Sequence, residues 1–208
     1  MTFRVAIIDY GAGNPRSVLH AISYLGAEAE IIGDPDRLKG FSHIVLPGVG
    51  SFHSSINLIR SRGLDEALFE QIKLEVPLLG ICLGMQILAD RGSEGGETKG
   101  MGLISGDVDR FGFDITTSNL KIPHVGFDTV KPRLSSKLFA GFGEEVDFYF
   151  THSFRLRCAS GQAVAADAWH GEPYVAAIEQ GSVAGTQFHP EKSQRNGLRL
   201  MLNFLERF

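Results

Sequence analysis

The sequence predicts one α/β domain over residues 1–208, with a mostly parallel central sheet, helices on both of its faces and a smaller antiparallel portion. Two observations predict this class. In the first half of the chain, apolar strand-like segments alternate with amphipathic helix-like segments, which is the pattern of a parallel sheet covered by helices. After Gly100 the segments become shorter and strand-like, which favours antiparallel pairing. We find no linker, repeat or low-complexity stretch that divides the chain.

The first half opens with an apolar strand over residues 5–9. Asn14 then predicts the start of a helix, because Pro15 stands in its first turn and apolar residues recur at helical spacing from Val18 to Leu25. The remaining elements predicted for this half are strands over residues 29–32, 43–47 and 77–81 and a helix over residues 64–75.

The second half is predicted to hold most of the antiparallel strands. Residues 92–102 are rich in glycine and predict a surface loop. A final helix is predicted over residues 193–208, where Leu198, Met201 and Leu205 recur at helical spacing. The strands predicted between these two segments cover residues 125–130, 146–150, 164–168, 174–178 and 183–188.

Cys82 lies within Gly80-Ile81-Cys82-Leu83-Gly84, between an apolar run and a helix-like stretch that ends near Asp90. This arrangement predicts a nucleophile elbow, in which flanking glycines leave room for a sharp strand-to-helix turn and supply unusual φ values. The N-H dipoles of the following helix favour a thiolate. Taken alone, a buried apolar cysteine at a strand end is the commoner interpretation.

A histidine and a carboxylate follow the last predicted strand, in Gln187-Phe188-His189-Pro190-Glu191. Strand-like alternation would place His189 and Glu191 on one face, where the carboxylate can orient the imidazole. A cysteine nucleophile, a histidine base and an orienting carboxylate form a catalytic triad in the general sense. We therefore predict Cys82, His189 and Glu191 as the catalytic residues.

Composition excludes several other classes of function. A net charge of −4 without a basic run argues against nucleic-acid binding, and the longest apolar runs are too short to cross a membrane. The N-terminal residues lack the pattern of a signal peptide, and two cysteines do not make a disulfide framework, so we expect a cytoplasmic protein with reduced thiols. Neither a phosphate-binding loop nor a metal-ligand spacing is found, and no cofactor or metal is expected.

The segment Pro47-Gly48-Val49-Gly50 ends the strand that precedes the elbow strand in sequence order. Alone it is more typical of a simple turn. In company with the triad, its free N-H groups at Val49 and Gly50, together with the N-H of Leu83, can face a developing oxyanion.

These motifs resemble a known family. Gly80 to Gln86 and His189 to Ser193 resemble the class I, triad-type glutamine amidotransferases, which have a flavodoxin-like α/β domain that would cover the whole chain. Within that superfamily, four segments resemble the HisH family, the glutaminase subunits of imidazole glycerol phosphate synthase; they are residues 9–14, 47–50, 121–126 and 152–153.

The resemblance implies a glutaminase that works in a heterodimer. L-glutamine would be hydrolysed through a thioester on Cys82, and ammonia would pass through a channel to a HisF-type (β/α)8-barrel cyclase. That partner would make imidazole glycerol phosphate and aminoimidazole carboxamide ribotide in histidine biosynthesis. The resemblance also implies a glutaminase that is nearly silent until its partner binds ligand.

The resemblance further assigns roles to residues outside the triad. Gln86 and Glu94 would hold the α-carboxylate and α-amino ends of glutamine, and His152, Ser153 and Phe154 would offer backbone groups to it. The partner face and ammonia exit would involve Asn14, Lys121, Phe127 and Lys192. Ordinary roles compete with these: a surface amide, solvated charges, a satisfied strand-end histidine, a helix cap at Asn14 and a core position for Phe127.

Two departures from the family pattern leave a second partner open. Gly126-Phe127-Asp128 stands where the family usually has Gly-Trp-Asn, and Pro15 replaces an aliphatic residue. The alternative is a HisH-like paralogue that supplies ammonia to a HisF-like partner in cell-surface sugar amidination. A glutaminase of pyridoxal phosphate synthase would differ at residues 47–50 and 152–153. A non-catalytic regulatory subunit would have lost part of the triad, which is complete here.

Overall fold

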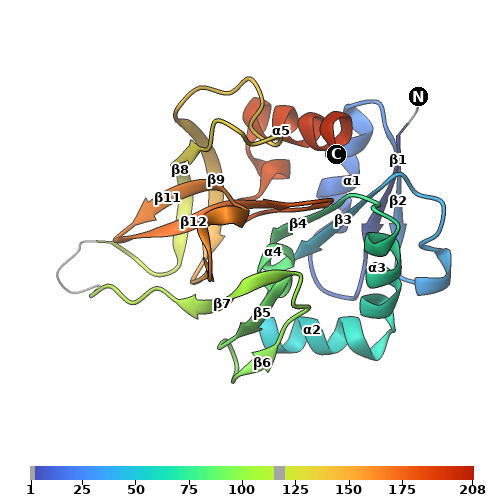
Figure 1. Cartoon of the computed structure of the whole chain (residues 1–208), viewed down its shortest axis with the longest axis horizontal. Coiled ribbons are helices and arrows are strands. Elements are labelled where there is room, and N and C mark those ends of the chain that lie inside the picture. The colour runs from blue at the N-terminus through green and yellow to red at the C-terminus, as the bar shows by residue number, and fades with distance from the viewer. Residues whose placement is uncertain (1–2, 115–119) are drawn as a thin grey trace.

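A mixed sheet forms the centre of the protein in the computed structural model, which describes residues 3–114 and 120–208 (Figure 1). Within those residues the sheet has nine strands. In order across the sheet they are β2 (Glu28–Ile32), β1 (Arg4–Ile8), β3 (His43–Gly48), β4 (Leu78–Cys82), β13 (Val183–Thr186), β12 (Glu172–Gln180), β11 (Val164–His170), β8 (His124–Pro132) and β9 (Val146–His152).

The sheet changes from parallel to antiparallel at β13, which confirms the expected mixed architecture. The strands from β2 to β13 pair in parallel, whereas β12, β11, β8 and β9 continue in antiparallel pairs. The ends of three central strands come together, because Gly48 of β3 pairs with Cys82 of β4 and Thr186 of β13 pairs with Ile81. A site at the carboxyl ends of parallel strands is therefore built from distant parts of the chain.

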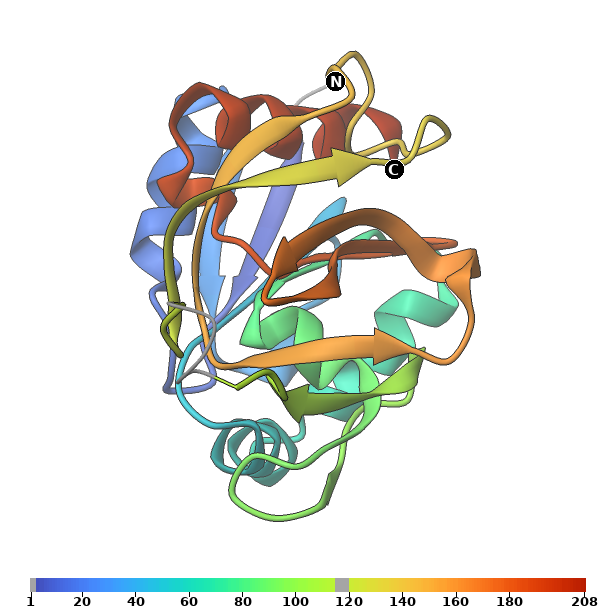
Figure 2. The same ribbon diagram turned by 90° about the vertical axis from the view of Figure 1, so that its left-hand side faces the viewer.

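Helices cover both faces of the parallel half, as predicted. Side chains of β1 alternate between two cores: Val5 and Ile7 pack in one, and Ala6 and Ile8 in the other. Figures 1 and 2 both show α1 (Pro15–Tyr24) beside α5 (Gln194–Arg207), with α2 (Phe52–Ser61) on the opposite side of the sheet. Helices α3 (Leu64–Lys73) and α4 (Leu83–Ile87) pack with α2 in the second core.

A second, smaller sheet lies next to α4, and the sequence analysis did not predict it. Over the described part of the chain it contains four strands, in the order β10 (Phe154–Cys158), β7 (Ile104–Arg110), β5 (Ala89–Gly92) and β6 (Thr98–Lys99). Its strands account for two differences from the predicted elements. The helix after the elbow ends at Ile87 and not near Asp90, because the chain passes directly into β5. The segment 92–102 is not wholly loop, since β6 pairs with β5.

Several other boundaries differ from prediction. Helix α2 was not predicted, and β13 ends at Thr186 before the residues expected to continue it. The chain continues from β13 into a short 3-10 helix, η3 (Pro190–Lys192); two further 3-10 helices are η1 (Pro35–Arg37) and η2 (Gly161–Ala163). Among the described residues no helix has the length and apolar character needed to cross a membrane.

Candidate active site

Cys82 stands at a sharp turn between β4 and α4, as the elbow predicts. Its backbone has φ +54° and ψ −110°, a conformation that residues with a Cβ rarely adopt. Of the two purposes predicted for the flanking glycines, room for the turn is confirmed and the unusual φ values are not, since neither glycine has a positive φ. A Cβ on Gly84 would lie 1.9 Å from the Leu46 carbonyl oxygen, so the glycine is required for space. The strained conformation belongs to the cysteine itself.

His189 and Glu191 form a buried pair, with Nδ1 of the imidazole 2.8 Å from Oε1 of the carboxylate. The predicted pairing is confirmed, but its predicted cause was wrong. Strand β13 ends at Thr186, and Pro190 begins the 3-10 helix η3. The turn of η3, and not strand alternation, therefore brings the carboxylate back to the imidazole.

The backbone of His189 is held on both sides. Its N-H donates to the Tyr149 carbonyl at 2.9 Å, and its carbonyl accepts from Ser193 Oγ at 2.7 Å. The same Ser193 oxygen accepts from the N-H of Tyr149 at 2.9 Å, which closes the loop. Sequence reasoning assigned no role to Tyr149 or Ser193. The only sequence signal for these hydrogen bonds was the presence of a serine in the segment His189 to Ser193.

The electrostatics favour a protonated imidazole at rest. Burial opposes the charge on His189, but the adjacent Cys82 and Glu191 outweigh it and raise the pKa of His189 to about 9. Protonated His189 thus places a positive charge next to the Cys82 sulfur. The thiol form can instead donate to the Thr151 carbonyl oxygen, which lies 3.9 Å from Sγ.

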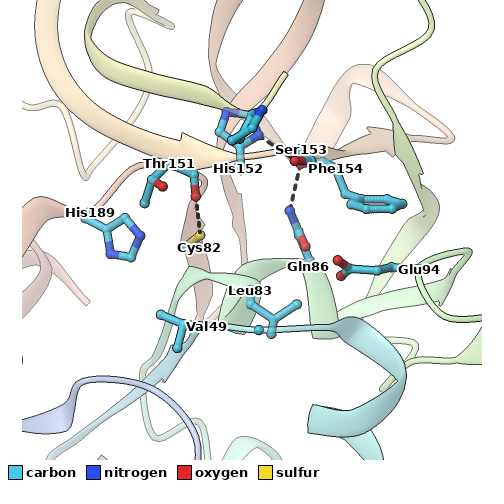
Figure 3. Close-up of a pocket in the computed structure, with 12 residues that line it drawn as sticks. Val49, Cys82, Leu83, Gln86, Glu94, Thr151, His152, Ser153, Phe154 and His189 are labelled. Atoms are coloured by element: carbon cyan, nitrogen blue, oxygen red, sulfur yellow. Dashed lines mark hydrogen bonds between the residues drawn. The ribbon is translucent and has the colours of Figure 1, made fainter. Parts of the chain in front are cut away.

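A pocket of about 350 Å³ opens over Cys82 (Figure 3). The structure brings ten of the predicted site residues to its wall: Cys82, His189, Val49, Gly50, Leu83, Gln86, Glu94, His152, Ser153 and Phe154. Glu191 lies behind His189 and does not line it. Thr151 and Pro123 line the pocket and were not predicted.

Gln86 and Glu94 lie across the pocket from His189 (Figure 3). Gln86 is only 3% exposed, and its Nε2 donates to the carbonyl of Phe154 and to Oε1 of Gln187, both at 2.9 Å. Glu94 is half-buried and accepts from the N-H of Phe52 at 2.9 Å, and burial raises the pKa of its carboxyl. Neither residue is the surface amide or freely solvated acid of the ordinary interpretation.

His152 belongs to a cluster of histidines behind the pocket. Its Nδ1 lies 2.8 Å from the Phe154 carbonyl and its Nε2 lies 3.2 Å from His124, while burial lowers its pKa to about 3. It is therefore a neutral, hydrogen-bonded residue and not a second general base.

The neighbouring side chains His124, Asp128 and His170 carry potential metal ligands within 4.8 Å of one another. The two imidazoles are stacked, with centroids 4.0 Å apart and planes inclined by 17°. Lone pairs in nearly parallel rings do not converge on one ion, as a tetrahedral site requires. His170 Nε2 is also bonded to the Lys121 carbonyl, at 2.9 Å. The cluster fits an aromatic support for His152 better than a metal centre.

Comparison with known proteins agrees with this geometry. The family model described as glutamine amidotransferase class-I matches residues 6–208. The chain belongs to this family. The class-I amidotransferase relatives include "Imidazole glycerol phosphate synthase subunit HisH 1" of Campylobacter jejuni, which is 43% identical over 96% of this chain and 98% of its own length. The HisH subunit of Dehalococcoides mccartyi is 39% identical over 97% of this chain and 96% of its own.

Solved structures show the same amidotransferase fold at lower identity. A glutamine amidotransferase crystal structure matches with a TM-score of 0.76 and 23% identity, covering 97% of each chain. A structure of PurLQS from Thermotoga maritima matches with a TM-score of 0.77 and 19% identity, covering 99% of this chain and 98% of that one. These likenesses confirm the fold class.

The four residues expected at the partner face of this amidotransferase lie in three different places: at the start of α1, beside the Tyr149 ring and in a separate hollow. Asn14 caps α1, since its Oδ1 accepts from the N-H of Ser17 at 3.3 Å. Phe127 is 52% exposed and packs edge-on against Tyr149, so it is not a core residue. Lys192 Nζ lies 5.8 Å from the centre of the same Tyr149 ring. Lys121 lines a different hollow, with Pro123 and Val125.

Proposed function

We propose that the protein is the glutaminase subunit of an imidazole glycerol phosphate synthase. The observation that carries the proposal is the shared pocket of Cys82 and His189, with Glu191 bonded behind the imidazole. Full-length relatives named as HisH subunits, about two-fifths identical to this chain, support the same assignment.

The triad supports a double displacement at the side-chain amide of glutamine. The Cys82 sulfur attacks the amide carbon, and the imidazolium of His189 gives its proton to the departing ammonia. Water then attacks the thioester, His189 accepts its proton, and glutamate leaves as the sulfur is released. Glu191 keeps the imidazole in one orientation and stabilises its positive charge through both steps.

We infer that Val49, Gly50 and Leu83 supply the oxyanion site. All three line the pocket beside Cys82, and the pairing of Gly48 with Cys82 keeps this segment at the nucleophile. Gly50 has φ +95°, so the peptide before it lies next to a residue that tolerates both signs of φ. Rotation of that peptide can replace the Val49 carbonyl by the Gly50 N-H at the oxyanion position. Such a rotation would switch glutamine hydrolysis on, because only the N-H can stabilise the oxyanion.

The part of the pocket opposite His189 suits the α-amino and α-carboxylate groups of glutamine (Figure 3). Oxygen atoms of Gln86 and Glu94 are acceptors for an α-ammonium group. The donors of Gln86 are already engaged by Phe154 and Gln187, so the α-carboxylate depends on the backbone of residues 152–154 or on movement of the Gln86 amide.

Ammonia would then pass to a HisF-type (β/α)8-barrel cyclase in a heterodimer. The exposed Phe127 and the neighbouring Tyr149 form an aromatic pair of the kind that is enriched at partner interfaces, with Lys192 beside it. Asn14 and Lys121 are proposed to extend this face. The names of the relatives favour the histidine-pathway cyclase over a paralogous partner for sugar amidination.

A glutamine analogue that carries a diazoketone in place of the amide tests the nucleophile directly. We expect it to alkylate Cys82 in the complex with the cyclase, to stop glutamate release, and to spare Cys158, as shown by peptide mapping. Glutamine should protect against labelling. Labelling of Cys158 with full loss of activity would contradict the proposal. If glutamate release were activated by the HisF-like barrel of sugar amidination and not by the histidine-pathway cyclase, the partner would be the paralogous barrel.

A further inference from the structure

Gln187 is a buried amide beside the Cys82 sulfur, and the reaction steps described above give it no task. Its side chain is 0% exposed, and its Nε2 donates to Cys82 Sγ at 3.7 Å. An amide removed from water costs stability unless its hydrogen bonds are satisfied. Its contacts therefore show what holds it in place and where its donor points.

The orientation of this amide follows from a chain of contacts that begins at a carbonyl group. The Phe154 carbonyl oxygen can only accept, so Gln86 must present its Nε2 there, at 2.9 Å. The same Nε2 also lies 2.9 Å from the amide of Gln187, which must therefore offer its oxygen. It follows that the N-H group of Gln187, and not its oxygen, faces Cys82.

A donor in this place distinguishes the two forms of the nucleophile. The thiol can donate to the Thr151 carbonyl, 3.9 Å away, but the thiolate has no proton for that contact. The N-H of Gln187 at 3.7 Å suits the anion, because a hydrogen bond to a charged acceptor is stronger than one to a neutral acceptor. The buried amide thus favours the reactive form and restrains the position of Sγ.

We propose that Gln187 is a positioning residue for the nucleophile, held in its donating orientation by Gln86 and the Phe154 carbonyl. The inference rests on the proposed function, because it takes Cys82 as the nucleophile. It also gives Gln86 a task besides substrate binding, since Gln86 links the pocket wall to the amide beside Sγ.

Gln187→Met removes the donor and keeps a similar side-chain volume. Iodoacetamide alkylation of the isolated protein at several pH values, with peptide mapping to separate Cys82 from Cys158, reports the thiolate. We expect the midpoint for Cys82 to rise by about one pH unit, and kcat for glutamine in the complex to fall roughly tenfold with KM changed by less than about twofold. Gln71→Met, which removes a buried amide from α3 outside the pocket, should leave the midpoint unchanged.

Gln187→Glu provides a second test that retains the contact with Gln86. One carboxyl oxygen can still accept from Gln86, while the other faces sulfur and donates only when protonated. We expect its alkylation rate relative to wild type to increase as the pH is lowered from about 8 to about 6, and Gln187→Met to show no such recovery.

The outcomes separate the inference from the function on which it rests. If Gln187→Met and Gln187→Glu both follow the wild-type alkylation profile while Cys82→Ala is inactive, the role of Gln187 is wrong and the proposed function stands. If Cys82→Ala still releases glutamate at the wild-type rate, the proposed function itself fails. Circular dichroism of each variant establishes that it is folded, and if Gln187→Met does not fold, the pH profile of Gln187→Glu decides.

Discussion

The backbone N-H of His189 donates to the carbonyl of Tyr149 at 2.9 Å, which fixes the proposed catalytic base to strand β9. The ring of Tyr149 contacts Phe127 and Lys192 on the outer side of that strand. A single residue therefore touches both the base and the proposed partner face. Displacement of the Tyr149 backbone on complex formation would be transmitted to His189 both through this hydrogen bond and through Ser193, which bonds to the backbone of both residues.

Removal of the nucleophile should abolish glutamine hydrolysis and leave the partner function intact. Cys82→Ala and Cys82→Ser are expected to fold, to bind the cyclase and to release no glutamate, because no other thiol lines the pocket among the described residues. Added ammonium salt should restore product formation by the mutant complex. Glutamate release near the wild-type rate would remove Cys82 from the mechanism.

Loss of the carboxylate charge should slow turnover without changing the shape of the site. We expect Glu191→Gln to reduce kcat by about two to four orders of magnitude, less than His189→Ala, because the imidazolium loses its stabilising partner but the base remains. Steady-state glutamate release by the complex measures both variants. Equal activity of Glu191→Gln and wild type would show that the 2.8 Å contact has no catalytic role.

The isolated protein should be nearly silent and should be activated by its ligand-bound partner. If the peptide between Val49 and Gly50 rests with its carbonyl toward the oxyanion position, the missing donor costs about two to three orders of magnitude in rate. Glutamate release is to be compared for the chain alone, for the complex, and for the complex with a cyclase substrate analogue. Three equal rates would identify a constitutive glutaminase.

The elbow should tolerate no side chain at Gly84. In Gly84→Ala the new Cβ would lie 1.9 Å from the Leu46 carbonyl oxygen, and both groups are backbone or attached directly to it. We expect a loss of roughly 1–3 kcal/mol in the free energy of unfolding, measured by urea titration. Gly161→Ala is the matched control, because no atom lies within 4 Å of its new Cβ. Equal losses in the two variants would show that the close approach is unimportant.

Stability should fall on acidification because neutral histidines are buried. Burial lowers the pKa of His43 to about 4 and that of His152 to about 3. Between these values and the unfolded value near 6.5 the unfolded chain binds more protons, so the free energy of unfolding decreases as pH falls, by at most roughly 1.4 kcal/mol per pH unit for each histidine.

His189 acts in the opposite direction, since its pKa is raised to about 9. The stability that it contributes is present below about pH 6.5 and is lost as pH rises through 9. The free energy of unfolding, measured by urea titration at a series of pH values, should therefore be largest near pH 6.5, which is about the pKa of a histidine in the unfolded chain. His43→Leu should flatten the acid limb, and His20→Gln, at an exposed position of α1, should not. Identical acid limbs in His43→Leu and wild type would contradict this account.

The parallel half of the fold was predictable because its strands and helices carry strong local signals. Strand β4 and helices α1 and α3 lie close to their predicted bounds. Helix α2 was missed although Phe52, Ile56 and Ile59 recur on its buried face. By contrast, β5 is only four residues long and contains Asp90 and Arg91, so its pairing with β7 depends on tertiary contacts that no local pattern reveals.

The pocket shared by Cys82 and His189 and the contact of His189 with Glu191 were predictable, because the elbow and the His-Pro-Glu motif each place characteristic residues in a few adjacent positions. The supporting contacts were not. The hydrogen bonds of Gln187 with Cys82 and of Tyr149 with Ser193 join segments far apart in the chain, and nothing in the immediate neighbours of these residues specifies those bonds. The sequence also led us to predict unusual φ values at the glycines, whereas the positive φ belongs to Cys82. A glycine needed for space and a glycine needed for its backbone conformation look the same in a sequence.

The parallel pairing of β13 with β4 has a consequence for biosynthesis of the protein. Cys82 leaves the ribosome long before His189, and the register of Thr186 with Ile81 must form before the two side chains share a pocket. Closure of such a long loop belongs to the slow, non-local steps of folding. Until this last parallel strand has paired with β4, Cys82 therefore lacks its proposed histidine base.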